Sequence, residues 1–238
     1  MKYKTEEHLF ILLQGLFIFG FNYWLVYMAE LHLTSGLVGL IFSTLVFMNI
    51  INSRIFLKTP FEVKVLMGGA LGLIGMALVF QKDLQTFSFS NNTSMALVMA
   101  VSGAYVASLG NIISARNQSK GIPVLQSNAY GMLYGGSAMA FLSLISGKEF
   151  TYEPTFGYLF SLGYLAIFGS VVAFTAYLTL IGRIGASRAG YVILVAPIIA
   201  LTLSTIFEDY RWSMLGIIGV VLILSGNALV LRMKASST

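Results

Sequence analysis

The fold is decided by long stretches without charge, and the clearest of them is Met95–Ala115, which reads MALVMAVSGAYVASLGNIISA. A helix needs about 20 mostly apolar residues to cross the hydrocarbon layer of a membrane, and this stretch provides them. A transmembrane β-strand would instead alternate apolar and polar residues over about 10 positions, which this stretch does not do. The stretch therefore predicts an α-helical membrane span.

Seven further stretches share its length and composition. Only 10% of the 238 residues are charged and 57% are hydrophobic, whereas soluble domains are about 25% charged. We therefore predict an all-α fold, a polytopic transmembrane helix bundle of about eight spans. In chain order the predicted spans are Leu9–Ala29, Gly36–Phe56, Val63–Phe80, Met95–Ala115, Leu125–Ser146, Phe156–Leu180, Gly190–Phe207 and Met214–Leu231.

The positive side chains are distributed unevenly between the two sides of these spans. Eleven of the 14 Lys and Arg residues fall on one side, and only Lys82, Lys148 and Arg211 fall on the other. Lys and Arg collect in the cytoplasmic loops of membrane proteins, so we expect both termini in the cytoplasm. Lys2 and Lys4 precede the first stretch as in a signal peptide, but the stretch is longer than a signal core and is taken as a span.

Residues that carry catalytic chemistry are missing from the predicted spans. Cysteine is absent, and no Gly-rich phosphate-binding loop with a Lys occurs. His8, His32 and Glu208 lie at span ends, and no ionisable residue lies near a midplane, where such residues usually mark function. We therefore predict that the protein is not an enzyme and has no cofactor and no metal site. We expect no nucleic-acid partner, because the inner loops account for the net charge of +5.

Two short segments have counterparts in the second half of the chain. Residues 75–79 read GMALV and residues 226–230 read GNALV, while residues 21–25 read FNYWL and residues 174–178 read FTAYL. The charge count places the first and sixth spans in opposite directions across the membrane. Inverted repeats of this kind are a construction of secondary transporters, whose substrate site lies near the midplane at the repeat interface.

The second half also carries a family resemblance. Residues 177–190 read YLTLIGRIGASRAG, Ala196-Pro197 places a proline within the seventh span, and Phe207-Glu208 is followed by MLGIIG at 214–219 and LSG at 224–226. As a set, these segments resemble the EamA type of the drug/metabolite transporter superfamily. That family has ten spans in two inverted five-helix repeats. The resemblance implies an incomplete first repeat of three spans in residues 1–85 and a second repeat of five spans in residues 86–238.

The chain departs from the family pattern in its first half. By this resemblance the eight spans are expected to match the family's third to tenth, and the family's first two spans, which help line its central cavity, are expected to have no counterpart. Thr44 stands where the matching helix would have a proline. The resemblance implies a transporter of small organic metabolites or drugs that works by alternating access. The alternative is a truncated, non-transporting membrane protein or an accessory subunit that needs a partner chain.

Neutral polar and aromatic side chains are the candidates for a substrate site. The resemblance points to four residues in spans that match cavity-facing helices, namely Asn22, Tyr105, Asn111 and Tyr177. We expect Tyr105 and Tyr177 to line a shared central cavity, with the two asparagines near it. Tyrosines near span ends also serve as interface anchors. Asparagines inside helices often form interhelical hydrogen bonds, which is the role that we favour for Asn49 and Asn52.

The expected setting is a bacterial inner membrane, with the lipid bilayer and a small-molecule substrate as partners. The protein is expected to be either a single chain or part of a homo- or hetero-oligomer. Glu208 lies beside Asp209 and Arg211 at the outer end of the seventh span, so we predict a structural role for it rather than proton transfer. Pro197 predicts a kink in that span, which serves either gating or packing.

Overall fold

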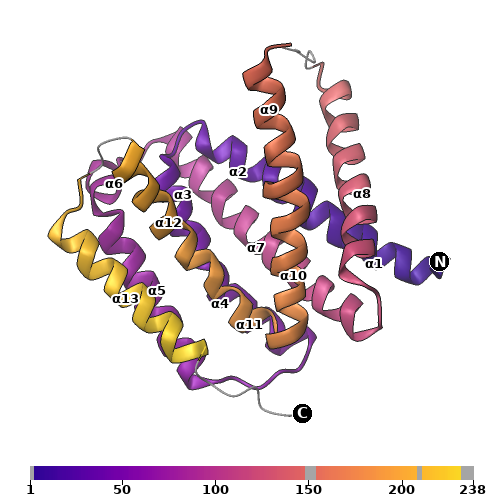
Figure 1. Ribbon diagram of the computed structural model, residues 1–238, viewed down its shortest axis with the longest axis horizontal. Helices are drawn as coiled ribbons and strands as arrows, with labels where there is room; N and C mark the ends of the chain where they lie inside the picture. The colour runs from indigo at the N-terminus through magenta and orange to yellow at the C-terminus, as the bar shows by residue number, and fades with distance from the viewer. Residues whose placement is uncertain (1–2, 148–153, 208–210, 232–238) are drawn as a thin grey trace.

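The structure is a computed structural model that describes residues 3–147, 154–207 and 211–231, and within these ranges every regular element is a helix (Figure 1). The all-α prediction is therefore confirmed. The prediction for Glu208 falls outside the described residues, as do Lys148 and both ends of the chain.

The first half of the chain forms three long helical rods and one short helix. The first rod is continuous and contains a π-helical segment, η1, between two α-helices. In chain order the elements are α1 (Thr5–Gly15), η1 (Leu16–Phe21), α2 (Asn22–Glu30), α3 (Ser35–Ser43), α4 (Leu45–Phe56), α5 (Val63–Val79) and α6 (Gln81–Thr86).

The second half adds five rods, and one of these also contains a π-helical segment, η2. Its elements are α7 (Asn91–Ser119), α8 (Val124–Ile145), α9 (Phe156–Tyr164), η2 (Leu165–Val172), α10 (Ala173–Ile184), α11 (Ala186–Ala189), α12 (Tyr191–Phe207) and α13 (Met214–Leu231). Each of the eight predicted spans corresponds to one of these rods.

Several rods have the length and composition of membrane spans. Among the described residues, five helices are long and apolar enough to cross a membrane, and they are Thr5–Glu30, Ser35–Phe56, Asn91–Ser119, Phe156–Ile184 and Ala186–Phe207. Val63–Val79 and Met214–Val230 are shorter apolar helices. The predicted bundle of about eight apolar helices is thus present, with two members near the lower limit of length.

Local sequence signals set the ends of these helices. The Thr34 hydroxyl accepts a hydrogen bond from the Leu37 amide at 3.3 Å and begins α3, and Thr155 caps α9 through the Tyr158 amide at 3.3 Å. These are N-caps, which satisfy amides that have no partner within the helix. Gly185 ends α10 with φ of 83°, a conformation that a side chain disfavours.

Helices α5 and α13 approach each other through glycine. A Cβ atom built on Gly75 would lie 2.5 Å from the Gly219 carbonyl oxygen, and one built on Gly219 would lie 2.5 Å from the Gly75 carbonyl oxygen. Gly226 and Gly68 face each other in the same way, since a Cβ on Gly226 would lie 2.6 Å from the Gly68 carbonyl oxygen. Only glycine permits this spacing of the two backbones.

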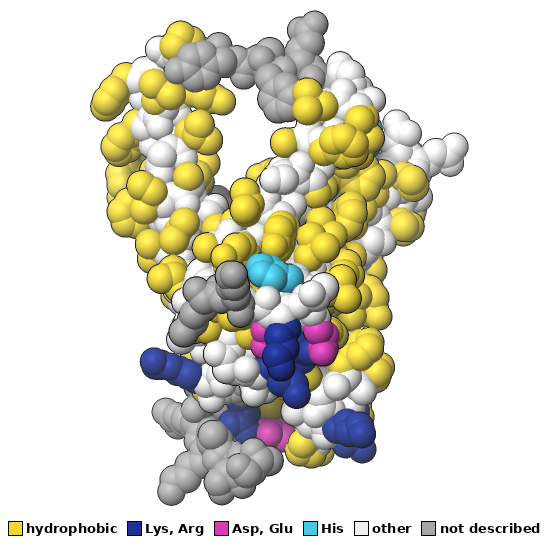
Figure 2. Space-filling view, turned by 90° about the vertical axis from the view of Figure 1, so that its right-hand side faces the viewer, with side chains coloured by type: hydrophobic (Ala, Val, Ile, Leu, Met, Phe, Trp, Pro, Cys, Tyr) yellow, Lys and Arg dark blue, Asp and Glu magenta, His cyan; other side chains and the backbone are white. Residues whose placement is uncertain are grey.

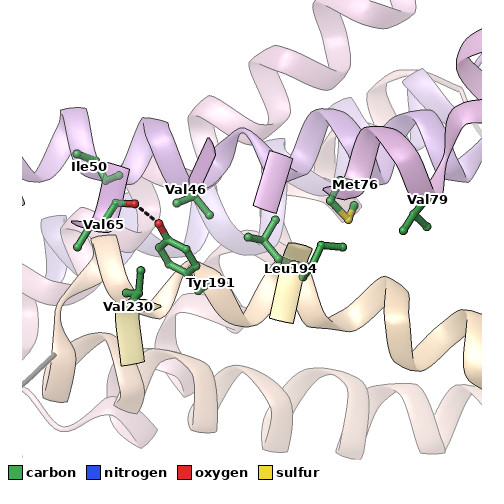
Figure 3. Close-up of a cluster of buried hydrophobic side chains, with 9 residues drawn as sticks. Val46, Ile50, Val65, Met76, Val79, Tyr191, Leu194 and Val230 are labelled. Atoms are coloured by element: carbon green, nitrogen blue, oxygen red, sulfur yellow. Dashed lines mark hydrogen bonds between the residues drawn. The ribbon is translucent and has the colours of Figure 1, made fainter. Parts of the chain in front are cut away.

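The start of α12 is fastened to this pair of helices. The Tyr191 hydroxyl donates a hydrogen bond to the Val65 carbonyl of α5, inside a buried cluster that includes Val46 and Leu194 (Figure 3). Tyr191 and Leu194 have no exposed surface. The interior of this part of the bundle is therefore packed by side chains from α4, α5, α12 and α13.

Charge and packing are both uneven over the molecule. Figure 2 shows Lys, Arg, Asp and Glu side chains gathered toward the lower end of the face in view, and apolar side chains over its upper part. The segment α9–η2 has no buried residue. In the most apolar stretch of Phe156–Ile184 only 11% of residues are buried, compared with 50% in Asn91–Ser119.

Candidate functional site

Three polar side chains from three helices meet inside the bundle. The Asn111 amide of α7 donates hydrogen bonds to the Tyr177 hydroxyl of α10 at 3.0 Å and to the Asn49 side-chain oxygen of α4 at 3.4 Å. Asn49 and Asn111 are buried, at 0% and 3% exposure. We call Asn49, Asn111 and Tyr177 the polar cluster, and it joins a helix of the first half to two helices of the second.

The polar cluster continues into the turn that begins α11. Asn49 donates to the Ala186 carbonyl at 3.1 Å, which ties α4 to the turn after α10. One helical turn along α4, Asn52 donates to the Ser108 hydroxyl of α7 at 2.9 Å. A buried amide needs partners, because leaving it without them costs about 1–3 kcal/mol. These contacts therefore fix the relative positions of α4, α7 and α11.

The chemistry of the polar cluster is neutral. An amide offers two donors and an acceptor, and a phenol offers one donor and one acceptor. Both amide hydrogens of Asn111 are used, and the Tyr177 hydroxyl also lies within hydrogen-bonding reach of the Asn49 side chain. The cluster is suited to hydrogen bonding of a polar solute, and it contains no acid–base pair.

The structure brings two of the four predicted site residues together, namely Asn111 and Tyr177. Asn22 begins α2, next to η1, and its amide donates to the Ile18 carbonyl of the same rod at 3.4 Å. The Asn22 side-chain oxygen is buried and has no hydrogen-bond partner among the described residues. Asn22 lies beside α7, because a Cβ atom built on Gly103 would be 3.5 Å from the backbone carbonyl oxygen of Asn22. The side-chain oxygen of Asn22 therefore remains available to accept a hydrogen bond next to α7.

Tyr105 lies on a different face of α7 from Asn111. It is 45% exposed and belongs to an exposed stripe with Met95, Val98 and Val101, whereas Asn111 is buried. Within the described residues no hydrogen bond or ring contact joins Tyr105 to the other three candidates. Its part in a shared cavity stays a prediction.

Sequence reasoning missed two contributions to the interior. Asn49 was expected to form an interhelical hydrogen bond, and it does so, but its position next to Asn111 and Tyr177 was not foreseen. An ion pair also joins Arg188 of α11 to Glu62 before α5, with Nη2 at 2.7 Å from Oε2. The sequence held one signal for this pair, because Glu62 and Arg188 have opposite charges and lie in short loops that were both predicted on the cytoplasmic side.

No group of three or more His, Asp or Glu side chains that could hold a metal ion occurs in the described part of the chain.

Comparisons with known proteins agree with the helical architecture. The chain is 28% identical over 225 residues to the uncharacterized inner membrane transporter YedA of Escherichia coli (strain K12), which covers 90% of this chain and 70% of that protein. It is 23% identical over 206 residues to a probable amino-acid metabolite efflux pump of the same strain, covering 81% and 66%. A solved structure at 17% identity superimposes with a TM-score of 0.77 over 92% of this chain and 74% of that one, which is a likeness of fold.

A family match covers most of the sequence. Residues 2–81 and 94–232 match the EamA-like transporter family. Within these ranges lie all three residues of the polar cluster and the Glu62–Arg188 ion pair. The chain is a multi-pass membrane protein that belongs to the EamA-like transporter family, a family of transporters and not of enzymes.

Proposed function

We propose that the protein moves small organic metabolites across a bacterial inner membrane by alternating access. The observation that supports this most is the polar cluster, because Asn49, Asn111 and Tyr177 join helices of both halves of a transporter-family chain. Polar groups inside a membrane protein face protein or a wet cavity rather than lipid. The substrate contacts would include Asn111 and Tyr177, with Asn22 and Tyr105 kept as predicted members.

The two halves of the chain, residues 1–85 and 86–238, are proposed to be inverted repeats of three and five spans. Two features support this. The π-helical segments η1 and η2 lie in the middle of the first and sixth rods, and π-segments occur frequently at functional sites. The glycine contacts are reciprocal at an offset of 151 residues, because Gly75 corresponds to Gly226 and Gly68 to Gly219.

Both termini are proposed to lie in the cytoplasm. The support is the charge distribution, since eleven of 14 Lys and Arg residues belong to one side of the spans. A reporter enzyme that is active only outside the cytoplasm, fused to the carboxyl terminus, is expected to stay inactive. Strong activity of that fusion would reverse the orientation.

The substrate class is proposed to be small organic metabolites such as amino-acid derivatives. One relative is named a probable amino-acid metabolite efflux pump. The neutral polar cluster offers hydrogen bonds but no charge, so a solute with a neutral polar part suits it. Right-side-out and inside-out vesicles loaded with a panel of radiolabelled metabolites would identify both the substrate and the direction.

The decisive experiment compares two substitutions in such a transport assay. Asn111→Ala removes the shared donor of the polar cluster and is expected to lower transport at least about tenfold, because a buried hydrogen-bonding group is lost. Ser137→Ala changes an exposed hydroxyl on α8 and serves as the control. Equal transport by both variants, at equal amounts in the membrane, would refute the proposed site.

A second candidate function is that of a subunit completed by a partner chain. The exposed segment α9–η2 favours it, because membrane helices usually pack at least one face against protein. Mass measurement of the purified protein in lipid nanodiscs distinguishes the two cases. A single chain that transports on its own would exclude the subunit function.

A further inference from the structure

A cavity opens at the end of the bundle where α4, α10 and α11 meet. Its volume is about 270 Å³. One part of its wall is apolar and includes Ile50, Val65 and Ile184. Another part is charged and includes Glu62, Arg183 and Arg188. The cavity is therefore amphipathic and large enough for a small organic molecule.

The charged wall carries one more positive than negative group. Arg188 directs only its Nη2 toward Glu62, at 2.8 and 2.7 Å from the two carboxylate oxygens, and its remaining N–H groups donate to no described residue. Arg183 is exposed and forms no ion pair with the described residues. A singly charged anion would neutralise this wall, whereas a cation would be repelled by the second guanidinium.

A buried hydroxyl supplies a third donor. Ser53 of α4 lines the cavity, is 2% exposed, and its hydroxyl has no hydrogen-bond partner among the described residues. A buried polar group without a partner is rare in proteins and often marks a site that something else completes. The hydroxyl, like the Arg183 guanidinium, is independent of the Glu62–Arg188 pair.

From these contacts we infer that the cavity binds a small organic carboxylate, with the carboxylate on Arg188 and Arg183 and the hydrocarbon part against Ile50 and Val65. A guanidinium binds a planar carboxylate through two parallel hydrogen bonds. The net charge of the wall matches a monoanion, and a phosphate dianion would overcompensate it. Simple carboxylic acids and amino acids share this chemistry, and in an amino acid the ammonium group would bind Glu62.

The cavity adjoins the polar cluster without being part of it. Ala186 lines the cavity, and its carbonyl accepts the hydrogen bond from Asn49. If the protein transports as proposed, the cavity is a binding site at the inner mouth. Binding itself does not depend on that proposal, because it can be measured at equilibrium on protein that transports nothing.

The test measures binding to the full chain in phosphatidylcholine nanodiscs by titration calorimetry. The probes are 4-methylpentanoate, its amide, leucine and isoamylamine, which share a branched hydrocarbon and differ in charge. We expect 4-methylpentanoate and leucine to bind and the amide and the amine not to bind. Tighter binding of leucine assigns the site to amino acids, and weaker binding assigns it to simple carboxylates. Equal binding of the amide or the amine would overturn the proposal.

Three variants locate the bound carboxylate. Arg183→Gln removes a cation that holds no ion pair with the described residues, so the fold should stay intact and binding should weaken about tenfold or more. Ser53→Ala should weaken binding by a smaller factor. Arg54→Gln is the control, because Arg54 is an exposed cation at the same end that packs on Phe61 and does not line the cavity. If Arg54→Gln weakens binding as much as Arg183→Gln does, binding depends on the general surface charge and not on the cavity, and the proposed site is refuted.

Glu62→Gln gives a result that a purely structural ion pair would not. Arg188 no longer has a competing carboxylate in this variant, so binding of 4-methylpentanoate should tighten, while leucine should gain less or weaken. If Glu62→Gln lowers the affinity for both probes, the pair does not compete with a ligand and the proposal fails. Loss of binding in phosphatidylglycerol nanodiscs would assign the cavity to a lipid phosphate and also overturn the proposal.

Discussion

The helix pair α5–α13 and the segment α9–η2 have similar compositions and opposite surroundings. Both are apolar and rich in glycine. In α5 and α13 the glycines bring two backbones into contact, whereas a Cβ on Gly157 or Gly163 of α9 would meet nothing within 4 Å. Glycine content by itself therefore does not predict close packing in this molecule.

The spacing of the glycines explains the difference. Gly68 and Gly75 are seven residues apart, as are Gly219 and Gly226, and seven residues turn a helix by about 700°, which is nearly two full turns. Gly157 and Gly163 are six apart, which rotates the second by about 240° from the first. The first spacing builds one flat face on each helix, and the second spreads the small residues around the helix.

The largest effect is expected where the two backbones touch. Gly75→Ala places a Cβ atom 2.5 Å from the Gly219 carbonyl oxygen, and neither backbone can yield without separating the helices. We expect the free energy of unfolding to fall by about 3 kcal/mol. Gly163→Ala is the matched control and should raise stability by up to about 1 kcal/mol, because alanine favours a helix. Unfolding titrations in mixed micelles measure both, and equal effects would contradict the comparison.

The next effect concerns the ion pair that fastens the end of the packed region. Arg188→Gln leaves Glu62 without its partner, and we expect a loss of about 2–3 kcal/mol, because the Arg188 side chain is only 10% exposed. Arg116→Gln removes the other pair, in which Glu6 is 73% exposed, and should cost less than about 1 kcal/mol. A similar loss in both variants would show that burial does not separate the two pairs.

A smaller effect is expected where the exposed segment joins the bundle. Tyr177→Phe removes the acceptor of the Asn111 amide and should lower stability by about 1 kcal/mol. Tyr105→Phe removes a hydroxyl with no partner among the described residues and should leave stability unchanged. If Tyr105→Phe destabilises the protein as much as Tyr177→Phe, Tyr105 is held by contacts that the single chain does not show.

The smallest effect is expected within the exposed segment itself. Leu165→Ala in η2 removes a side chain that is 59% exposed, and stability should change by no more than about 0.5 kcal/mol. The buried counterpart is Leu194→Ala in α12, which should cost about 2–3 kcal/mol. A large effect of Leu165→Ala would mean that another chain covers η2, and it would favour the subunit function.

Much of the fold was predictable from the sequence because length and apolar composition act locally. Each of the eight apolar stretches forms one helical rod, and the charged residues lie at or near the ends of the stretches. The pairing of α5 with α13 was harder to predict from the sequence, because it brings together residues that are 144 positions apart, such as Gly75 and Gly219. Nothing local in the sequence of α5 specifies that its glycines pack on α13.

The candidate site was predictable in part for the same reason. Asn111 and Tyr177 were expected to lie near one cavity, and they are hydrogen bonded. The exposure of Tyr105 depends on neighbours that only the assembled bundle supplies. The Glu62–Arg188 pair depends on two loops meeting, which hydropathy does not encode.

The contact between Gly75 and Gly219 has a consequence for biosynthesis. The chain leaves the ribosome from its amino terminus at about 5–20 residues per second, so α5 waits roughly 7–30 seconds for the helix that covers its glycine face. During that interval α5 stands in the translocon or the bilayer with its small-residue face uncovered. Insertion of α13, the last described helix of the chain, therefore covers the glycine face of α5. A chaperone or insertase that binds glycine-rich helix faces would have to bind α5 before α13 is inserted.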